Sequence, residues 1–252
     1  NNLKSLNYFK NVNLNVVDDI DNNKIVDIIV EEKPTGEIGA AAGVGTSGNS
    51  VGFFVKENNY LGKGIALETD LKFSSESING KFSIINPNFN DTDKSITVSV
   101  EGSEIDRFKD FGYKTNKTGF LLGTNFEFLN DFRLGLGNSN YYEKIETDST
   151  ASSLQKKQQG NYWDSFINLD FDYDKRNQKF RPSDGFRSFY RINMPLISDT
   201  STLSNLYNYT YYTDLYKDNV TTFSFYAKSS NSLTDDDIKL TERNFLPSNR
   251  LR

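Results

Sequence analysis

Apolar and polar residues alternate along most of this chain, with a period of two from position 35 onward. The stretch "IALETDLKF" (65–73) places Leu67 and Leu71 on one side and Glu68 and Asp70 on the other. The same alternation recurs in "SITVSVE" and "INLDFDYD". Because successive side chains of a strand point to opposite faces of a sheet, the pattern predicts strands with one apolar and one polar face.

About eleven such segments follow one another, joined by turn-rich sequence. Most span roughly 9–12 residues, which exceeds the ~5–6 of an average strand and fits the ~9–11 that a tilted strand needs to cross a membrane. Connections such as "LGKG" and "KDN" are short, whereas "KDFGYKTN" and "TDSTASSLQKKQQGN" are longer and more polar, a division typical of an outer-membrane β-barrel. The predicted strands are 36–46, 50–61, 64–75, 80–89, 94–106, 117–128, 131–145, 162–175, 185–197, 205–217 and 219–230.

In a barrel of this kind one face of the sheet meets lipid and the other lines the lumen. We expect lipid contact for Leu67, Leu71, Ile96, Val98, Leu169, Phe171, Tyr209 and Tyr211. The lumen face should carry Glu68, Asp70, Asp170, Asp172, Asp174, Arg187 and Arg191, with the two arginines as partners for the aspartates. The alternative is a large soluble β-sandwich with solvated acidic faces, which should have shorter strands.

Composition removes several classes of function. The mean hydropathy is −0.62, and no run approaches the ~18–20 apolar residues of a membrane helix. The chain has no Cys and no His, so disulfides, thiolate metal sites and the commonest general base are all excluded. The net charge of −5 provides no basic surface for nucleic acid, and aromatic residues reach 14%, which suits a barrel with interfacial rings.

The first 34 residues differ from the rest. Leu3, Leu6 and Phe9 fall at helical spacing, and "KIVDIIVEEKP" is an apolar strand ended by Pro34. A helix end followed by two strands predicts part of a small α+β module at 1–34, with the barrel segment at 35–252. No signal peptide opens the sequence, and it stops in a polar stretch, so we expect an internal segment of a longer polypeptide.

Several motifs, in order, resemble the BamA family of outer-membrane-protein assembly factors, which join periplasmic POTRA domains to a β-barrel. The acidic strand end before "PTG" resembles the junction between the last POTRA domain and the barrel in that family. "NNYLGKG" resembles the end of the second strand, "INPNF" the family's Asn-Pro-aromatic-Phe signature, and "FRPSDGFR" its Phe-Pro-Thr-x-Gly-x-Arg signature. "ERNFLPSNRLR" resembles the sixth extracellular loop, with Arg252 as the arginine of its motif.

The resemblance implies an all-β fold: an antiparallel meander forming about eleven strands of a transmembrane barrel that has about sixteen when complete. It also implies a bacterial outer-membrane location with the N-terminal module in the periplasm. The expected function is the assembly of client barrels, with unfolded outer-membrane proteins, accessory lipoproteins and membrane lipid as partners and no cofactor.

The first barrel strand is rich in Gly and Ala, which have low strand propensity. A sheet edge built from them should open at modest cost and template another strand. In the family this strand is understood to be a lateral gate, which implies a client-binding role for Gly36, Gly39, Ala40, Ala41, Gly43, Val44 and Gly45. The alternative is that these small residues make room for inward-packed side chains or a tight bend.

The predicted turn around Pro182 and Gly185 is by itself only a hairpin signal. The resemblance implies that it is a family signature together with Arg187. It also implies that the loop bearing Arg252 folds into the lumen, where a guanidinium can make bidentate contacts with carboxylates; Asp170 and Asp172 are the local candidates.

Catalytic chemistry is not expected, because no nucleophile–base set is visible. The glycines near 43–48 lack the Gly-Lys-Ser/Thr of a phosphate loop, and "TDDDIK" (234–239) is predicted to be a solvated loop with no metal site. The alternatives to a client-inserting machine are a passive or secretory barrel transporter, such as a two-partner secretion pore or a TamA-like translocation factor, and an outer-membrane barrel enzyme.

Overall fold

The computed structural model describes residues 8–18, 24–45, 48–178, 181–216 and 219–244. A two-stranded sheet, β1 (Phe9–Asp18) with β2 (Lys24–Glu32), precedes one large antiparallel sheet of eleven strands. Those strands are β3 (Gly36–Gly45), β4 (Gly48–Tyr60), β5 (Ile65–Ser74), β6 (Ser77–Asn86), β7 (Ser95–Arg107), β8 (Tyr113–Leu129), β9 (Phe132–Thr147), β10 (Gly160–Asp174), β11 (Gly185–Ile197), β12 (Thr202–Tyr216) and β13 (Asn219–Ser232).

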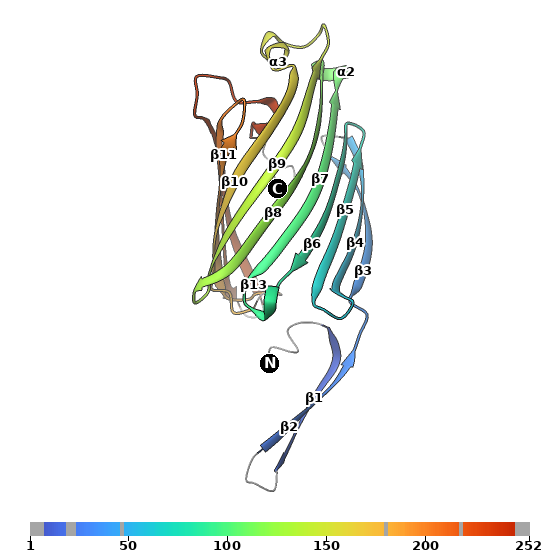
Figure 1. Ribbon diagram of the computed structural model, residues 1–252, viewed down its shortest axis with the longest axis vertical. Helices are drawn as coiled ribbons and strands as arrows, with labels where there is room; N and C mark the ends of the chain where they lie inside the picture. The colour runs from blue at the N-terminus through green and yellow to red at the C-terminus, as the bar shows by residue number, and fades with distance from the viewer. Residues whose placement is uncertain (1–7, 19–23, 46–47, 179–180, 217–218, 245–252) are drawn as a thin grey trace.

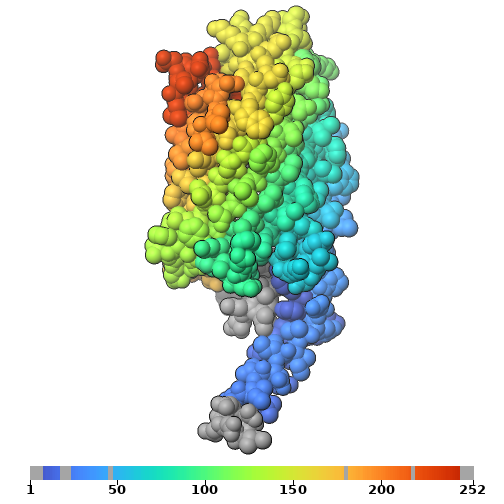
Figure 2. Space-filling view, viewed as in Figure 1, coloured from blue at the N-terminus to red at the C-terminus, as the bar shows by residue number. Residues whose placement is uncertain are grey.

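Each strand of the large sheet pairs with the strands before and after it in sequence, which makes the sheet a simple meander. The sheet curls, so that its later strands pass behind β8 and β9 in Figure 1. The β1–β2 hairpin projects from one end of this curled wall, next to the start of β3 (Figures 1 and 2). Within the described residues β3 and β13 are the two edges, and they do not pair with each other.

The strand registers sort side chains onto two faces. Ser83, Ser99 and Ser139 lie in one cross-strand row with Glu68 and have 3–5% of their surface exposed. This row lies on the inner, concave face. The neighbouring residues point outward, and Leu122, for example, is 54% exposed. An exposed apolar outer face beside a polar inner face is the pattern that the alternation predicts.

The two predicted sets of side chains fall on opposite faces of the sheet. The pairing of Glu68 with Ser83, and onward through the rows to β10, places Glu68 and Asp170 on the same inner face. Arg187 lies opposite Asp174 on that face, whereas Tyr209 lies opposite Ser188 on the outer face.

Four predicted strand boundaries are wrong by three or four residues: both ends of β6, the start of β8 and the start of β12. β6 ends at Asn86, because Pro87 cannot donate to the ladder, and a short 3-10 turn, η1 (Phe89–Asp91), follows. β8 begins at Tyr113, because a single helical turn, α2 (Phe108–Phe111), completes the chain reversal that was predicted to be a long loop. The predicted division, with short turns at one end of the sheet and long loops at the other, is weaker than expected. The connection 175–184 lies at the same end as the tight 130–131 turn.

The helix expected at the N-terminus lies mostly at 1–7, outside the described residues. At Phe9 the prediction is wrong, since Phe9 opens β1. Of the predicted α+β module, the described residues contain the two strands. In the described part of the chain, every helix is too short or too polar to span a bilayer.

Candidate functional site

Strand β3 is one of the two edge strands of the large sheet within the described residues. Its register with β4 runs without interruption from Gly36 opposite Glu57 to Gly45 opposite Gly48. On its other side, no strand of the described residues pairs with it. Seven of its ten residues are Gly or Ala, which contribute little side-chain packing to a sheet. This composition gives β3 a weak intrinsic strand preference.

The backbone register decides which groups of β3 are available. The Asn58 backbone N–H donates to the Thr35 carbonyl at 3.4 Å. In an antiparallel pair, residues alternate between bonding to the partner strand and pointing both backbone groups away from it. Counting from Thr35, Ala41 bonds to β4, whereas Ala40 and Ala42 direct their N–H and C=O groups to the open edge. Gly36, Ile38 and Val44 share that outward phase.

The inward-facing glycines of β3 divide into two kinds. The Phe54 ring lies across Gly39, where a Cβ would meet the ring at 2.1 Å. At Gly43 the nearest atom to an added Cβ is Ser50 Oγ at 3.6 Å, which is ordinary contact. Gly39 thus fits the alternative prediction, in which a small residue makes room for an inward side chain, whereas space does not require Gly43.

The motif at the end of β4 organises the chain where the hairpin meets the sheet. The Asn58 side chain donates to the Thr35 carbonyl at 3.1 Å. Asn59 Oδ1 accepts the Gly64 N–H at 2.7 Å across the β4–β5 turn, and Glu57 accepts from the Thr35 hydroxyl and from the Asn59 N–H. These bonds fix the direction in which β3 enters the sheet.

Three inner-face aspartates of β10, Asp170, Asp172 and Asp174, pair with arginines. Arg191 and Asp170 form a bidentate pair, with both N–O distances at 2.6 Å. Arg187 reaches Asp172 at 2.7 and 2.8 Å instead of Asp174, its direct cross-strand neighbour. Asp174 is already held by Arg176 of the following turn, at 2.7 and 2.8 Å.

The Phe189 ring lies between the two arginines of β11, at 5.9 Å from the guanidinium carbon of Arg187 and 5.3 Å from that of Arg191. Each arginine therefore has a carboxylate partner and an aromatic face. Asp170 and Asp172 are engaged locally, and Arg252, for which they were candidate partners, lies outside the described residues.

The turn between β10 and β11 depends on Asn177 and Gly185. Asn177 Oδ1 accepts the N–H groups of Ser183 and Asp184 at 3.2 and 3.3 Å, which closes the loop around Pro182. Gly185 has φ +94°, and a Cβ there would lie 2.1 Å from the Lys175 carbonyl oxygen. This glycine is thus required by both backbone conformation and space.

We expect Gly185→Ala to lower the free energy of unfolding by about 1–3 kcal/mol, the usual cost of forcing a residue with a Cβ into a left-handed conformation. Urea titration of the folded barrel measures it. The control is Gly102→Ala, because Gly102 has no positive φ and no atom within 4 Å of an added Cβ. Equal destabilisation by the two changes would contradict the role given to Gly185.

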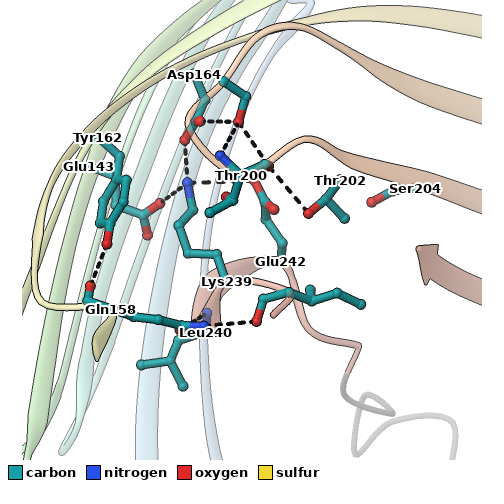
Figure 3. A network of polar contacts seen from close by, with 12 residues as sticks. Glu143, Gln158, Tyr162, Asp164, Thr200, Thr202, Ser204, Lys239, Leu240 and Glu242 are labelled. Atoms are coloured by element: carbon teal, nitrogen blue, oxygen red, sulfur yellow. Dashed lines mark hydrogen bonds and ion pairs between the residues drawn. The ribbon is translucent and has the colours of Figure 1, made fainter. Parts of the chain in front are cut away.

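A third feature was not predicted. The segment 233–244 after β13, here called the inner loop, folds back against the inner face near the ends of β9 and β10 (Figure 3). Lys239, predicted to lie in a solvated loop, has 0% of its side chain exposed. Its Nζ lies 3.0 Å from Glu143 of β9 and also bonds Asp164 of β10. A third carboxylate, Glu242 of the short helix η2 (Leu240–Glu242), lies at 3.6 Å.

Gln158 clamps the backbone beside this lysine. It follows α3 (Ser153–Lys157) in the β9–β10 connection, donates from Nε2 to the Ile238 carbonyl at 3.2 Å, and accepts the Leu240 N–H at 2.9 Å. Both atoms of its amide are therefore used to hold the inner loop. One signal is visible in the sequence, a single lysine between two apolar residues after three aspartates, but it does not locate the acids on β9 and β10.

A curled meander with an apolar outer face, a charged inner face and a loop packed inside defines an outer-membrane β-barrel protein. The model of the Omp85 superfamily domain matches residues 59–248, and the chain belongs to that superfamily. The family match covers the strands from the end of β4 to the inner loop.

Solved structures agree in fold. BamA from Haemophilus ducreyi, in a crystal structure lacking POTRA domains 1–3, has 19% identity and a TM-score of 0.70 over 92% of this chain and 48% of that one. CdiB from Acinetobacter baumannii has 9% identity and a TM-score of 0.53 over 92% of this chain and 46% of that one. The chain thus spans about half the length of these proteins. Comparison with curated proteins gives no match.

Proposed function

We propose that this protein assembles client β-barrels and inserts them into the outer membrane by presenting β3 as a template for a client strand. The observation that carries the proposal is the Gly/Ala-rich composition of β3, together with the backbone groups of Ala40 and Ala42, which are directed away from β4. An incoming strand would gain main-chain hydrogen bonds there without any demand on its side chains. Such recognition suits clients of differing sequence.

The position of the edge supports this activity. The β1–β2 hairpin lies next to the start of β3, and the bonds from Asn58 to Thr35 fix that junction. We infer that the hairpin is the end of a POTRA domain at 1–34 and lies in the periplasm, where unfolded clients and accessory lipoproteins would reach it. The apolar outer face would contact membrane lipid.

The proposed activity needs no catalytic side chain and no cofactor. Its driving force is the formation of strand pairs and the burial of the client in lipid, because unpaired backbone groups cost several kcal/mol in a bilayer. An insertase therefore needs an edge that opens and closes, which low strand propensity permits.

A secretory transporter is the second candidate, because the fold is also similar to that of CdiB. The two activities make different demands on β3. A transporter needs a continuously closed wall and a cleared lumen, whereas an insertase needs β3 to exchange partners. The higher similarity to BamA and the composition of β3 support the insertase.

A client-folding assay in liposomes tests the proposal with two substitutions at one position. Ala42→Pro removes an outward N–H without touching a β3–β4 bond, and Pro is tolerated at such edge sites. We expect it to slow client folding by about two- to tenfold. This factor corresponds to the loss of one hydrogen bond with a net free energy of about 0.5–1.5 kcal/mol. Ala42→Gly keeps both the N–H and the low strand propensity and should retain the rate. Equal rates for wild type and Ala42→Pro would contradict templating at β3.

A further inference from the structure

The anchor of the inner loop holds more negative than positive charge. Lys239 supplies one ammonium, and Glu143, Asp164 and Glu242 supply three carboxyl groups, so full ionisation would leave a net charge of −2 in the cluster. All four side chains are nearly or fully buried, at 0% for three of them and 8% for Glu242. Burial of uncompensated charge is costly, and buried acids commonly take up a proton instead.

The three acids are not equally compensated. Asp164 bonds the Lys239 ammonium and accepts the Ser198 hydroxyl at 2.6 Å. Glu143 lies 3.0 Å from the ammonium. Glu242 is the most distant, at 3.6 Å, and Thr202 is the hydroxyl group beside its carboxyl group. Glu242 is therefore the acid whose ion pair with the Lys239 ammonium is the longest of the three.

Other charged groups near Glu242 come from several strands. It shares a cavity of about 440 Å³ with Lys117 of β8, Arg191 of β11 and Lys228 of β13. Arg191 is already paired with Asp170, and the Lys117 ammonium lies 4.1 Å from the centre of the Tyr141 ring. The Lys239 ammonium lies 4.9 Å from the centre of the Tyr162 ring of β10.

None of these groups reaches Glu242 with a hydrogen bond. Nor do the acidic groups of the described residues form a set that could hold a metal ion.

We propose that the inner loop is a proton-operated latch, docked when Glu242 is protonated and released when Glu242 ionises. Docking places neutral Glu242 beside the Lys239–Glu143–Asp164 group. Ionisation adds a charge to a side chain that is only 8% exposed, and release of the loop exposes that charge to water. The proposal holds for an insertase and for a transporter alike, because it concerns access to the inner face.

The direction of the pH dependence follows from the buried state. Burial raises the pKa of Glu242 above its usual value, and Lys239, the Thr202 hydroxyl and Lys117 only partly oppose this rise. Burial alone would lower the pKa of Lys239, but Glu143, Glu242 and Asp164 outweigh it and raise that pKa, so the ammonium stays charged. An acid whose pKa is raised on docking stabilises the docked state at low pH, and this contribution is lost as pH rises through the raised pKa.

Spin-label distances test the latch in the complete protein in liposomes. The chain has no cysteine, so labels can be placed at Asp235→Cys, on the exposed part of the inner loop, and Lys157→Cys, on exposed α3. We expect one short distance at pH 5 and a growing long-distance population towards pH 9. Each unit by which docking raises the pKa of Glu242 changes the docked-to-released ratio by about tenfold across this transition.

Glu242→Gln should keep the short distance at every pH, because the amide cannot ionise. Asp237→Asn, at an exposed acid of the same loop, should titrate like wild type. A single pH-independent distance in wild type would overturn the proposal. So would a Glu242→Gln protein that still releases its loop at high pH. Circular dichroism at both pH values shows that the sheet remains folded in each variant.

Discussion

Lys239→Met should release the inner loop from the barrel wall, at a cost of about 3–5 kcal/mol in the free energy of docking. The expected size is that of removing one partner from a buried ion pair, because the remaining partners are left uncompensated. Here Glu143 and Asp164 would each lose the ammonium that lies beside them. Protease cleavage within 233–244 measures the release, since a docked loop resists cleavage.

Two further proteins separate the charge effect from general damage. Lys157→Met removes an exposed lysine of α3 and should leave cleavage unchanged. Lys239→Met combined with Glu143→Gln and Asp164→Asn removes the stranded charges and should restore part of the protection, as a neutral buried group costs less than an unpaired charge. Unchanged cleavage in Lys239→Met would show that the buried lysine does not hold the loop.

Leu122→Arg should destabilise the folded protein in a bilayer by about 2–4 kcal/mol, whereas Leu121→Arg should cost far less. The range is that measured for a cationic side chain on the lipid face near the midplane of a β-barrel. Leu122 lies on the outer face and is 54% exposed, opposite Val98 and Asn138. Leu121 is its neighbour on β8 but faces inward, where it lines the same cavity as Lys117 and Arg191.

Folding of the two variants into liposomes over a urea series provides the comparison. The same substitution of the same residue type, one position apart, controls for helix or strand propensity and for side-chain size. Equal destabilisation by the two changes would mean that the faces of the sheet do not meet lipid and water as assigned.

The strands and their faces could be predicted because period-two alternation is a local property of the sequence. The pairing of Arg187 and Arg191 with aspartates followed from the same alternation, since both sets fall on one face. The particular partners did not follow. Arg187 bonds Asp172 because Arg176, a turn residue, occupies Asp174.

The remaining features depend on contacts between distant segments. Nothing around Lys239 shows that Glu143 and Asp164, far away in sequence, will surround it. The purpose of Gly39 is visible only once Phe54 is placed across it. The outward phase of Ala40 and Ala42 depends on the first hydrogen bond of the register, between Thr35 and Asn58. Hydrophobic periodicity contains none of this information.

The central claim, that β3 templates client strands, is tested most directly by site-specific photocrosslinking in the complete protein during the assembly of a client barrel. A probe replaces Ala42 on the open edge, and a matched probe replaces Phe120 on the outer face of β8, in the middle of the sheet. Templating predicts crosslinks from position 42 to a terminal strand of the client and none from position 120. Efficient capture at position 120 with none at position 42 would contradict the account.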